Sequence, residues 1–397
     1  MNFDGKDQQR IDFWVFNKDL EESTLKTYLN CLKKYCKTVG KSPNELIEEA
    51  DAENDQGIRS RDRKINHYLL KFKKQLKSEG KARATIHLYI HAVKSFYDAL
   101  DVETPKIKTP QGDITQEKNY GKLISLNEIK TLVNVAAPRE KALIYLMALS
   151  GMAQAEARNL TIKKFMDAVG ESLNREIESM KDLFEVEHSL DQEILTLHIV
   201  RKKVNHRYIT FIPPEATIQI IYYLKERMYG RNQNIRITDI NSPIFVKING
   251  EPIDRDIIVT NFRRIGLEAG FKKEEGAYSF WRAHGLRKYF ISTIMNKLGD
   301  KVLADYLVGH KLSGNDRAYW YPDEEDLKKR YLKALPYLSI DNAKVLEIKT
   351  EDYVRIERVE RDQNKLKKKM SRTQMIVDVI EKNPKILAKL EEEFYKS

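Results

Sequence analysis

The chain has 397 residues, a formal net charge of +11 and 41% hydrophobic residues, which suffice for ordinary cores in two or more domains. No apolar run reaches the length of a membrane span, and we expect no signal peptide. The only cysteines, Cys31 and Cys36, argue against a disulfide framework and a zinc site. The basic excess would help to hold a polyphosphate, although many solvated proteins are equally basic.

The first hundred residues predict an entirely helical domain. Apolar residues recur at helical spacing in three stripes, and the short segment from Pro43 to Ala50 adds another helix. We therefore predict a small four-helix bundle. The stripes are Leu25, Tyr28, Leu29, Leu32 and Tyr35, then Ile65, Tyr68, Leu69, Phe72 and Leu76, then Ile86, Tyr89, Ile90, Val93, Phe96 and Tyr97.

Basic residues gather beside the second stripe and just after it. They are either a DNA-binding surface or an ordinary solvated face. A Pro-, Lys- and Gly-containing stretch then predicts a linker over residues 104–122, so the helical domain covers residues 1–103. The basic residues are Lys71, Lys74, Lys77, Lys81 and Arg83.

A second domain is predicted over residues 123–340. Ser125 can cap a helix that runs through Ala136, and the next helix, from Arg139 to Leu149, leads into Gly151. Residues 194–212 alternate between apolar and polar on both sides of a basic turn, which is typical of a β-hairpin. The chain as a whole should be mainly α with a small β-hairpin, an α+β protein.

Five residues near the end of this domain suit phosphodiester chemistry. They are His284, Arg287, His310, Tyr319 and Tyr321. A phenol, with a pKa of about 10, can attack a phosphodiester and be displaced again by a sugar hydroxyl. A guanidinium can bind the phosphate oxygens in a bidentate way, and imidazole can donate or accept a proton near neutral pH. The alternative is that the tyrosines are an aromatic edge of the core and the histidines are surface donors.

The order and spacing of these residues resemble the tyrosine recombinase, or phage-type integrase, family. In that family an Arg follows a His by three residues, a Gly-His comes roughly twenty residues later, and the nucleophilic Tyr about nine after that. Here Arg287 follows His284 by three residues, His310 comes twenty-three later, and Tyr319 nine beyond. The resemblance covers roughly residues 12–340. It implies that Tyr319 is the nucleophile, with Tyr321 in reserve, and that Arg287, His284 and His310 bind the phosphate or support the transition state.

Two upstream positions complete the family pattern, and one of them departs from it. Lys203 lies where the family places a hairpin lysine that acts as general acid, and Lys202 is the fallback. The first family box usually carries an arginine two residues after a glycine, but Ala153 stands there. Arg158 lies five residues further, about 140° around a helix. The explanations left open are a branch that recruits Arg158, an engineered replacement of the arginine, and a natural protein with weakened catalysis.

The resemblance implies a site-specific recombinase that cuts and rejoins DNA through a 3′-phosphotyrosine and a four-way junction. It further implies a C-shaped clamp of a core-binding and a catalytic domain on double-stranded target sites. The enzyme would be a cytoplasmic, nucleoid-associated homo-tetramer on two duplexes, with no metal and no cofactor. Alternatives are a relaxing enzyme like a type IB topoisomerase and a DNA-binding protein that lost the chemistry. A magnesium-dependent nuclease, built on Glu324 and Glu325, is weaker.

Residues 341–397 lie beyond the resemblance. A weak heptad pattern runs from Val345 to Met370, interrupted by Asp352 and Gln363. A short coiled coil, a helix docked on a neighbouring protomer and a partly disordered arm all remain open. Because family members commonly use such a segment to contact a neighbour, we predict a helical tail with a possible role in oligomerisation.

Overall fold

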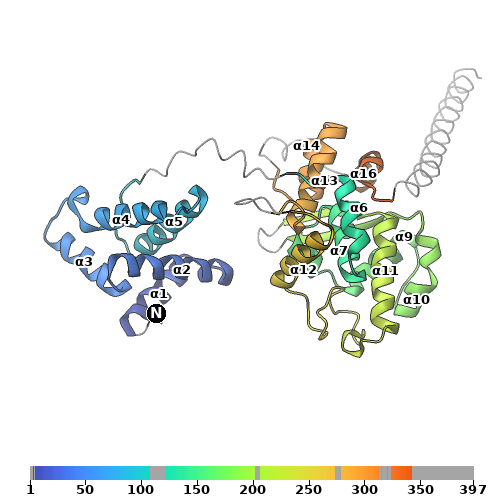
Figure 1. The fold of residues 1–397 in the computed structure, drawn as a ribbon, viewed down its shortest axis with the longest axis horizontal. Helices are drawn as coiled ribbons and strands as arrows, with labels where there is room; N and C mark the ends of the chain where they lie inside the picture. Colours follow the sequence, from blue (N-terminus) through green and yellow to red (C-terminus); the bar gives the residue numbers. More distant parts are fainter. Residues whose placement is uncertain are drawn as a thin grey trace, which may run out of the picture. The chain divides into compact units, whose positions relative to one another are not determined.

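The computed structural model describes residues 3, 5–107, 122–201, 206–272, 279–312, 314, 320 and 323–341. The chain divides into two compact units, Met1–Lys118 and Asn119–Ser397 (Figure 1). The division falls inside the stretch predicted as a linker, and the domain boundaries drawn from the sequence stay predictions. Among the described residues no helix is both long and apolar enough to cross a membrane.

The described part of the first unit consists of five α-helices, one more than predicted. The additional helix is α1, whose Ile11 and Trp14 are buried, with Trp14 packed edge-on against Phe96. Phe13 and Phe16 on the same helix are exposed, so the apolar residues of this segment do not follow a single helical face and no stripe was predicted there. The helices are α1 (Gly5–Asn17), α2 (Glu22–Val39), α3 (Pro43–Asp55), α4 (Lys64–Ser78) and α5 (Arg83–Ala99).

The three predicted stripes supply most of the remaining core of this unit. Leu32 and Tyr35 of α2 are fully buried, as are Phe72 of α4 and Phe96 of α5. Cys31 and Cys36 also lie on α2 as free, buried thiols. Burial raises the pKa of the Cys31 thiol to about 11 and that of Cys36 to about 12.

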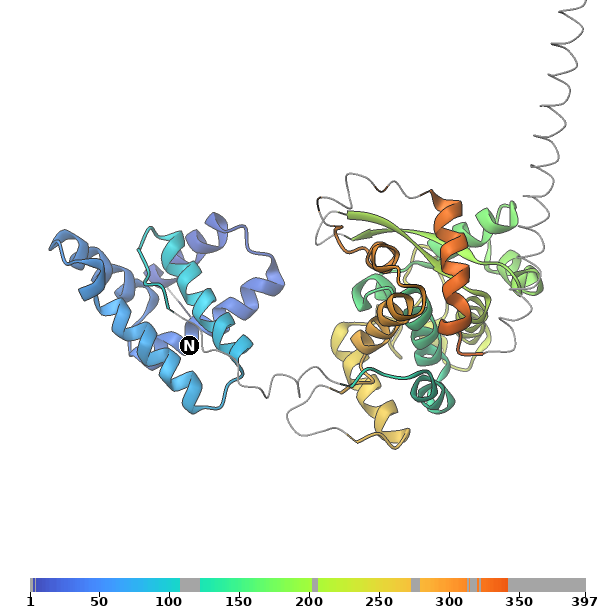
Figure 2. The same ribbon diagram turned by 90° about the horizontal axis from the view of Figure 1, so that it is seen from above.

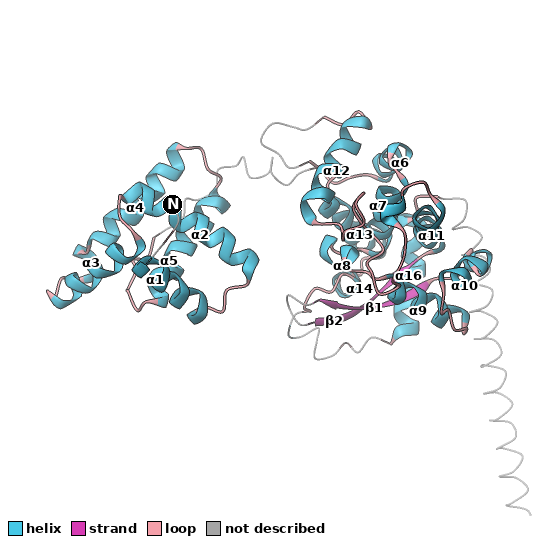
Figure 3. Ribbon diagram, turned by 90° about the horizontal axis from the view of Figure 1, so that it is seen from below, coloured by secondary structure: helices cyan, strands magenta, loops and turns pink. Residues whose placement is uncertain are grey.

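The described residues of the second unit are helical apart from one antiparallel hairpin, which confirms the predicted fold class (Figure 3). Strand β1 (Leu195–Arg201) pairs with β2 (His206–Ile212), with Leu195 opposite Ile212 and Arg201 opposite His206. The hairpin lies beside α16 and α14 (Figure 2). The helices are α6 (Leu126–Val135), α7 (Pro138–Ser150), α8 (Gln154–Arg158), α9 (Ile162–Leu173), α10 (Met180–Glu185), α11 (Pro214–Tyr229), α12 (Arg255–Glu268), α13 (Ala283–Leu298), α14 (Lys301–Leu307) and α16 (Glu324–Leu338).

Helix α7 lies at the centre of this unit. Every residue from Ala142 to Ser150 is buried, and the helix packs against both α11 and α13. A helix that is apolar on all sides must be enclosed by others. Because α7 is enclosed by the core, its C-terminal end at Ser150 is held in place.

The predicted N-terminal cap of α6, the helix that precedes α7, is confirmed. The Ser125 hydroxyl accepts from the Glu128 amide, and the Glu128 carboxylate accepts from the Ser125 amide.

Candidate active site

Helix α7 ends at Gly151 in a left-handed turn that only glycine fits. Its φ is 67°, and its amide donates to the Met147 carbonyl oxygen. A Cβ at Gly151 would lie 2.4 Å from the Phe290 ring and 2.7 Å from the Val308 side chain. The turn therefore lies directly against α13 and the segment that follows α14.

Arg287 of α13 is locked between these two segments. Its side chain is only 4% exposed. Nη1 donates to the Gly151 carbonyl oxygen at 2.9 Å, and Nη2 to that of Val308 at 2.6 Å. Burial lowers the pKa of the guanidinium, while the nearby Glu156 carboxylate raises it. Both contacts fix the plane of the fork before any ligand arrives.

Glu156, in the first turn of α8, joins the neighbouring pieces. Its Oε2 accepts from the Ala153 amide at 2.5 Å and from the Tyr208 hydroxyl at 2.8 Å, and it lies 3.7 Å from Nη1 of Arg287. Its Oε1 lies 3.1 Å from Nε of Arg201. One carboxylate, 7% exposed, thus faces two guanidinium groups.

Arg201 is the residue of this cluster that sequence reasoning missed. It ends strand β1, and its Nη1 donates to the Gly309 carbonyl oxygen at 2.8 Å. In the sequence, Arg201 belongs to an Arg-Lys-Lys run at the hairpin turn, of which only the two lysines were predicted as site residues. The pairing of Arg201 with Glu156 could not be predicted, because that contact exists only once the hairpin packs beside α8.

The two histidines lie near the arginines along the chain, His284 three residues before Arg287 and His310 directly after Gly309, whose carbonyl oxygen accepts from Arg201. The ring Nδ1 of His310 is 2.9 Å from the Asp305 carboxylate, and the His310 amide donates to the Asp305 carbonyl oxygen. His284 lies one helical turn before Arg287 and is exposed. Partial burial lowers the pKa of His284, and the charges of Arg282, Lys288, Arg287 and His310 lower it further. The charges of Arg287 and His310 thus both act on His284.

Four of the residues predicted for the site are not among those that the structure describes. Lys202, Lys203, Tyr319 and Tyr321 fall outside the described residues. Trp320, between the two tyrosines, packs edge-to-face on Tyr306 of α14, with ring centroids 5.0 Å apart. This contact places Trp320 against the helix that leads to His310.

Arg158 occupies the last turn of α8. Its Nε is buried and has no hydrogen-bond partner within the part of the chain that the structure describes. Ala153, before α8, provides a backbone amide to Glu156 and no cation.

The basic residues predicted to bind DNA are all exposed in the first unit. Three lie on α4 and two at the turn into α5. Such a row can reach phosphates without first breaking buried contacts. The residues are Lys71, Lys74, Lys77, Lys81 and Arg83.

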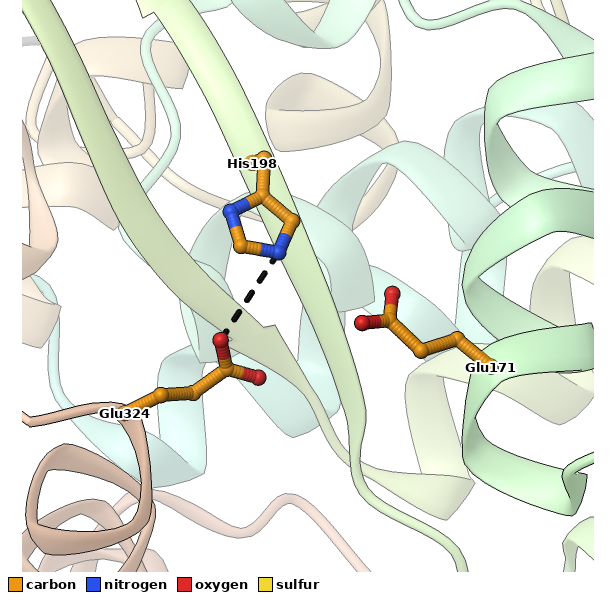
Figure 4. A group of neighbouring side chains, drawn as sticks. All are labelled: Glu171, His198 and Glu324. Atoms are coloured by element: carbon orange, nitrogen blue, oxygen red, sulfur yellow. Dashed lines mark ion pairs between the residues drawn. The ribbon is translucent and has the colours of Figure 1, made fainter.

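A separate group of polar side chains lies around His198 of the hairpin (Figure 4). Glu171 of α9, His198 of β1 and Glu324 of α16 bring their ligand atoms within 4.8 Å of one another. His198 Nε2 lies 3.7 Å from Glu324 Oε2. These three residues could hold a divalent cation, but an exposed His–Glu pair needs none to explain it. Glu325, which the sequence paired with Glu324, instead approaches Lys329.

Comparison with known families agrees with this arrangement. The model of the phage integrase family matches residues 122–325, which include the Gly151 turn, Arg201, Arg287, His310 and both tyrosines. The chain belongs to the phage integrase family. The resemblance read from the sequence is therefore confirmed.

Solved structures with the same fold include two of lambda integrase. Residues 75–356 of that protein, a dimer bound to a COC′ core site, give a TM-score of 0.50 at 13% identity, covering 80% of this chain and 98% of that one. Its tetramer bound to a Holliday junction gives 0.50 at 14% identity, covering 80% of each chain. XerA recombinase is 20% identical, covering 82% of this chain and 96% of that one, with a TM-score of 0.35. No curated protein matched. At these identities the two lambda integrase structures establish only the fold of this integrase family member.

Proposed function

We propose that this integrase family member is a site-specific DNA recombinase that cuts and rejoins DNA through a 3′-phosphotyrosine intermediate. One observation carries the proposal. Arg287 is fixed between the Gly151 turn and Val308, two residues before His310, and the charges of Arg287 and His310 both act on His284. These are the side chains that the family pattern assigns to a scissile phosphate.

In the proposed reaction Tyr319 attacks the phosphorus atom through its phenolic oxygen. The bond from phosphorus to the 5′-oxygen breaks, and that oxygen takes a proton from a general acid, for which Lys203 is the candidate. The phosphodiester linkage is kept in the phosphotyrosine, so the strand can be rejoined without an energy-supplying cofactor, and the proposed reaction uses neither water nor a metal. Arg287 would bind the non-bridging oxygens as charge grows on them, and the histidines would donate to the same oxygens or take the phenolic proton.

The proposed partner is double-stranded DNA with specific target sites. Exposed Lys71, Lys74, Lys77, Lys81 and Arg83 support binding to the backbone of a duplex. By analogy with the lambda integrase tetramer bound to a Holliday junction, the working form would be a homo-tetramer on two duplexes, acting on the nucleoid in the cytoplasm. The predicted C-shaped clamp and the predicted tail at residues 341–397 belong to the same proposal.

The test is a nicked suicide duplex, cut from the DNA that flanks the gene, incubated with the full chain in EDTA. We expect a covalent protein–DNA product that Tyr319→Phe abolishes while duplex binding is kept, because only the phenolic oxygen is removed. Tyr321→Phe is the matched control and should keep most of the product. A product that survives Tyr319→Phe but not Tyr321→Phe would move the nucleophile, and cleavage that requires a divalent cation would contradict the proposal.

A second candidate is a DNA-binding protein with weakened catalysis, which the absence of an arginine at Ala153 favours. In that case the wild-type chain binds the duplex but forms little covalent product. Ala153→Arg should then raise the amount of product substantially.

A further inference from the structure

We propose that Arg201 supplies the second guanidinium for the scissile phosphate, in the role that the family gives to the arginine missing at Ala153. The proposal rests on the proposed function and names one more group of the same site. It would make the loss at Ala153 compatible with an active enzyme.

The first argument is position. Arg287 donates to the carbonyl oxygen of Val308 and Arg201 to that of Gly309, which are neighbouring residues of the chain. Both guanidinium groups also face Glu156. His310 follows Gly309 directly, so a phosphate that reaches Arg287 and His310 lies within reach of Arg201.

The second argument is charge. Two guanidinium groups face a single carboxylate, which leaves one positive charge without a counterion among the described residues of the cluster. The charge of Arg201 acts against that of Arg287, since it lowers the pKa of Arg287. A bound phosphate would relieve this repulsion, and more so in the transition state, when extra charge lies on its non-bridging oxygens.

The third argument is access. The side chain of Arg201 is 28% exposed, whereas that of Arg287 is 4% exposed. Nε and Nη1 of Arg201 are engaged with Glu156 and Gly309, which orients the fork, and Nη2 carries two further N–H donors. Arg158, the candidate from the sequence, has no contact of this kind with Glu156 or the 308–310 turn among the described residues, and its Nε is buried without a partner.

The experiment compares two suicide duplexes, one with an ordinary scissile phosphate and one with a methylphosphonate there, which lacks the charge of one non-bridging oxygen. Single-turnover formation of the covalent product is measured at saturating protein. We expect Arg201→Ala to slow the reaction on the phosphate by about 100-fold or more, as loss of one donor to transition-state charge does. On the methylphosphonate the loss should shrink below about 10-fold, because less charge remains to be stabilised.

Further variants separate the effect of the charge from that of the contacts. Arg201→Lys and Arg201→Gln both disturb the contacts to Glu156 and Gly309, but only lysine keeps the charge. The lysine variant should therefore form the covalent product faster than the glutamine variant on the phosphate, and at a similar rate on the methylphosphonate. This pair remains informative if the alanine variant folds poorly. Ala153→Arg should restore cleavage to Arg201→Ala. Arg207→Ala, at an exposed position of the same hairpin, is the matched control and should react within about 3-fold of wild type.

Equal losses on the two duplexes would overturn the proposal and reduce Arg201 to a structural pin for Glu156. A charge-dependent loss in Arg158→Ala, without one in Arg201→Ala, would overturn it in favour of the sequence candidate. The proposed function is judged separately by the dependence of the wild-type product on Tyr319. If that dependence holds while Arg201 shows no charge effect, only this inference fails; if no Tyr319-dependent product forms, both fail.

Discussion

Among single residues, Glu156 connects more of the candidate active site than its position in a short helix would indicate. It binds the Ala153 amide, the Tyr208 hydroxyl and Arg201, and it lies beside Arg287. A buried ion pair of this kind adds little net stability, because burying the charges costs about as much as their attraction gains. Removing the carboxylate alone is strongly destabilising, because it leaves buried positive charges without partners.

We expect Glu156→Gln to destabilise the second unit by about 3 kcal/mol, because the amide keeps the hydrogen-bonding shape but not the charge. The measurement is urea unfolding followed by fluorescence. Glu171→Gln, an exposed glutamate on α9, is the control and should change the free energy of unfolding by less than about 0.5 kcal/mol. A similar small change in Glu156→Gln would mean that solvent already screens the two arginines.

Among single residues, the sequence predicted those site residues that lie close together along the chain. His284, Arg287 and His310 follow one another within one segment, so their spacing alone grouped them. Arg201 and Glu156 are distant in sequence and meet only through packing, and no local pattern reports such a contact. Lys203 and Tyr319 fall outside the described residues, so their roles stay predictions.

Among the elements, the hairpin depends on a second glycine turn. Gly309 has a φ of 67°, and a Cβ there would lie 2.5 Å from the Tyr208 ring of β2. The hairpin is therefore in contact with the turn that carries His310. This close approach brings Arg201 to the Gly309 carbonyl oxygen.

We expect Gly309→Ala to separate the hairpin from this turn, and to slow formation of the covalent product by about 10-fold or more, as small displacements of catalytic groups do. The control is Gly299→Ala, which has the same φ of 67° but no atom within 4 Å of the added methyl group. Both variants bear the cost of about 1–2 kcal/mol for an L-residue in this conformation. If the two react equally fast, the approach of Tyr208 does not matter for the chemistry.

Elements were predictable where local signals agree with the fold. Ser125, followed three residues later by Glu128, defines the start of α6, and the alternation around residues 195–212 defines the hairpin. Helix α1 was missed, because exposed Phe13 and Phe16 share it with buried Trp14. Only the neighbouring helices decide which of these aromatic rings is covered.

For the second unit as a whole, Glu215 links the N-terminus of α11 to the last described residues. Its carboxylate accepts from the amides of Ile340 and Asp341 and is 4% exposed. Burial, and then the charge of Asp341, raises its pKa from 4.5 to about 7, against the effect of those hydrogen bonds.

This raised pKa predicts how stability depends on pH. Between pH 4.5 and about 7 the folded state holds more protons than the unfolded state, so the free energy of unfolding falls as the pH rises through this window. The expected fall is about 3 kcal/mol at most. Glu215→Gln, which keeps an acceptor for both amides, should flatten the dependence. Urea titrations from pH 4.5 to 8 provide the measurement, and an unchanged slope in the variant would refute the assignment.

The same contact sets where the tail can be removed. Because Asp341 also accepts from the Tyr145 hydroxyl, a chain that ends after Asn342 should stay folded, whereas one that ends after Ser339 should lose stability. We predict that the chain ending after Asn342 binds one site normally but assembles poorly on paired sites. Gel shifts on one-site and two-site duplexes measure this. Equal assembly with and without the tail would leave it as an accessory DNA-binding arm.

The two buried thiols of α2 make the chain suitable for spectroscopy. With pKa values of about 11 and 12, Cys31 and Cys36 hold almost no thiolate near neutral pH and should resist maleimide reagents while the first unit is folded. They are the only cysteines in the sequence. Cysteines introduced at exposed positions, such as Asp51→Cys in one unit and Lys181→Cys in the other, would therefore take up a donor and an acceptor dye selectively. Energy transfer between the dyes, recorded as duplex is added, would report whether the distance between the two units changes when DNA binds.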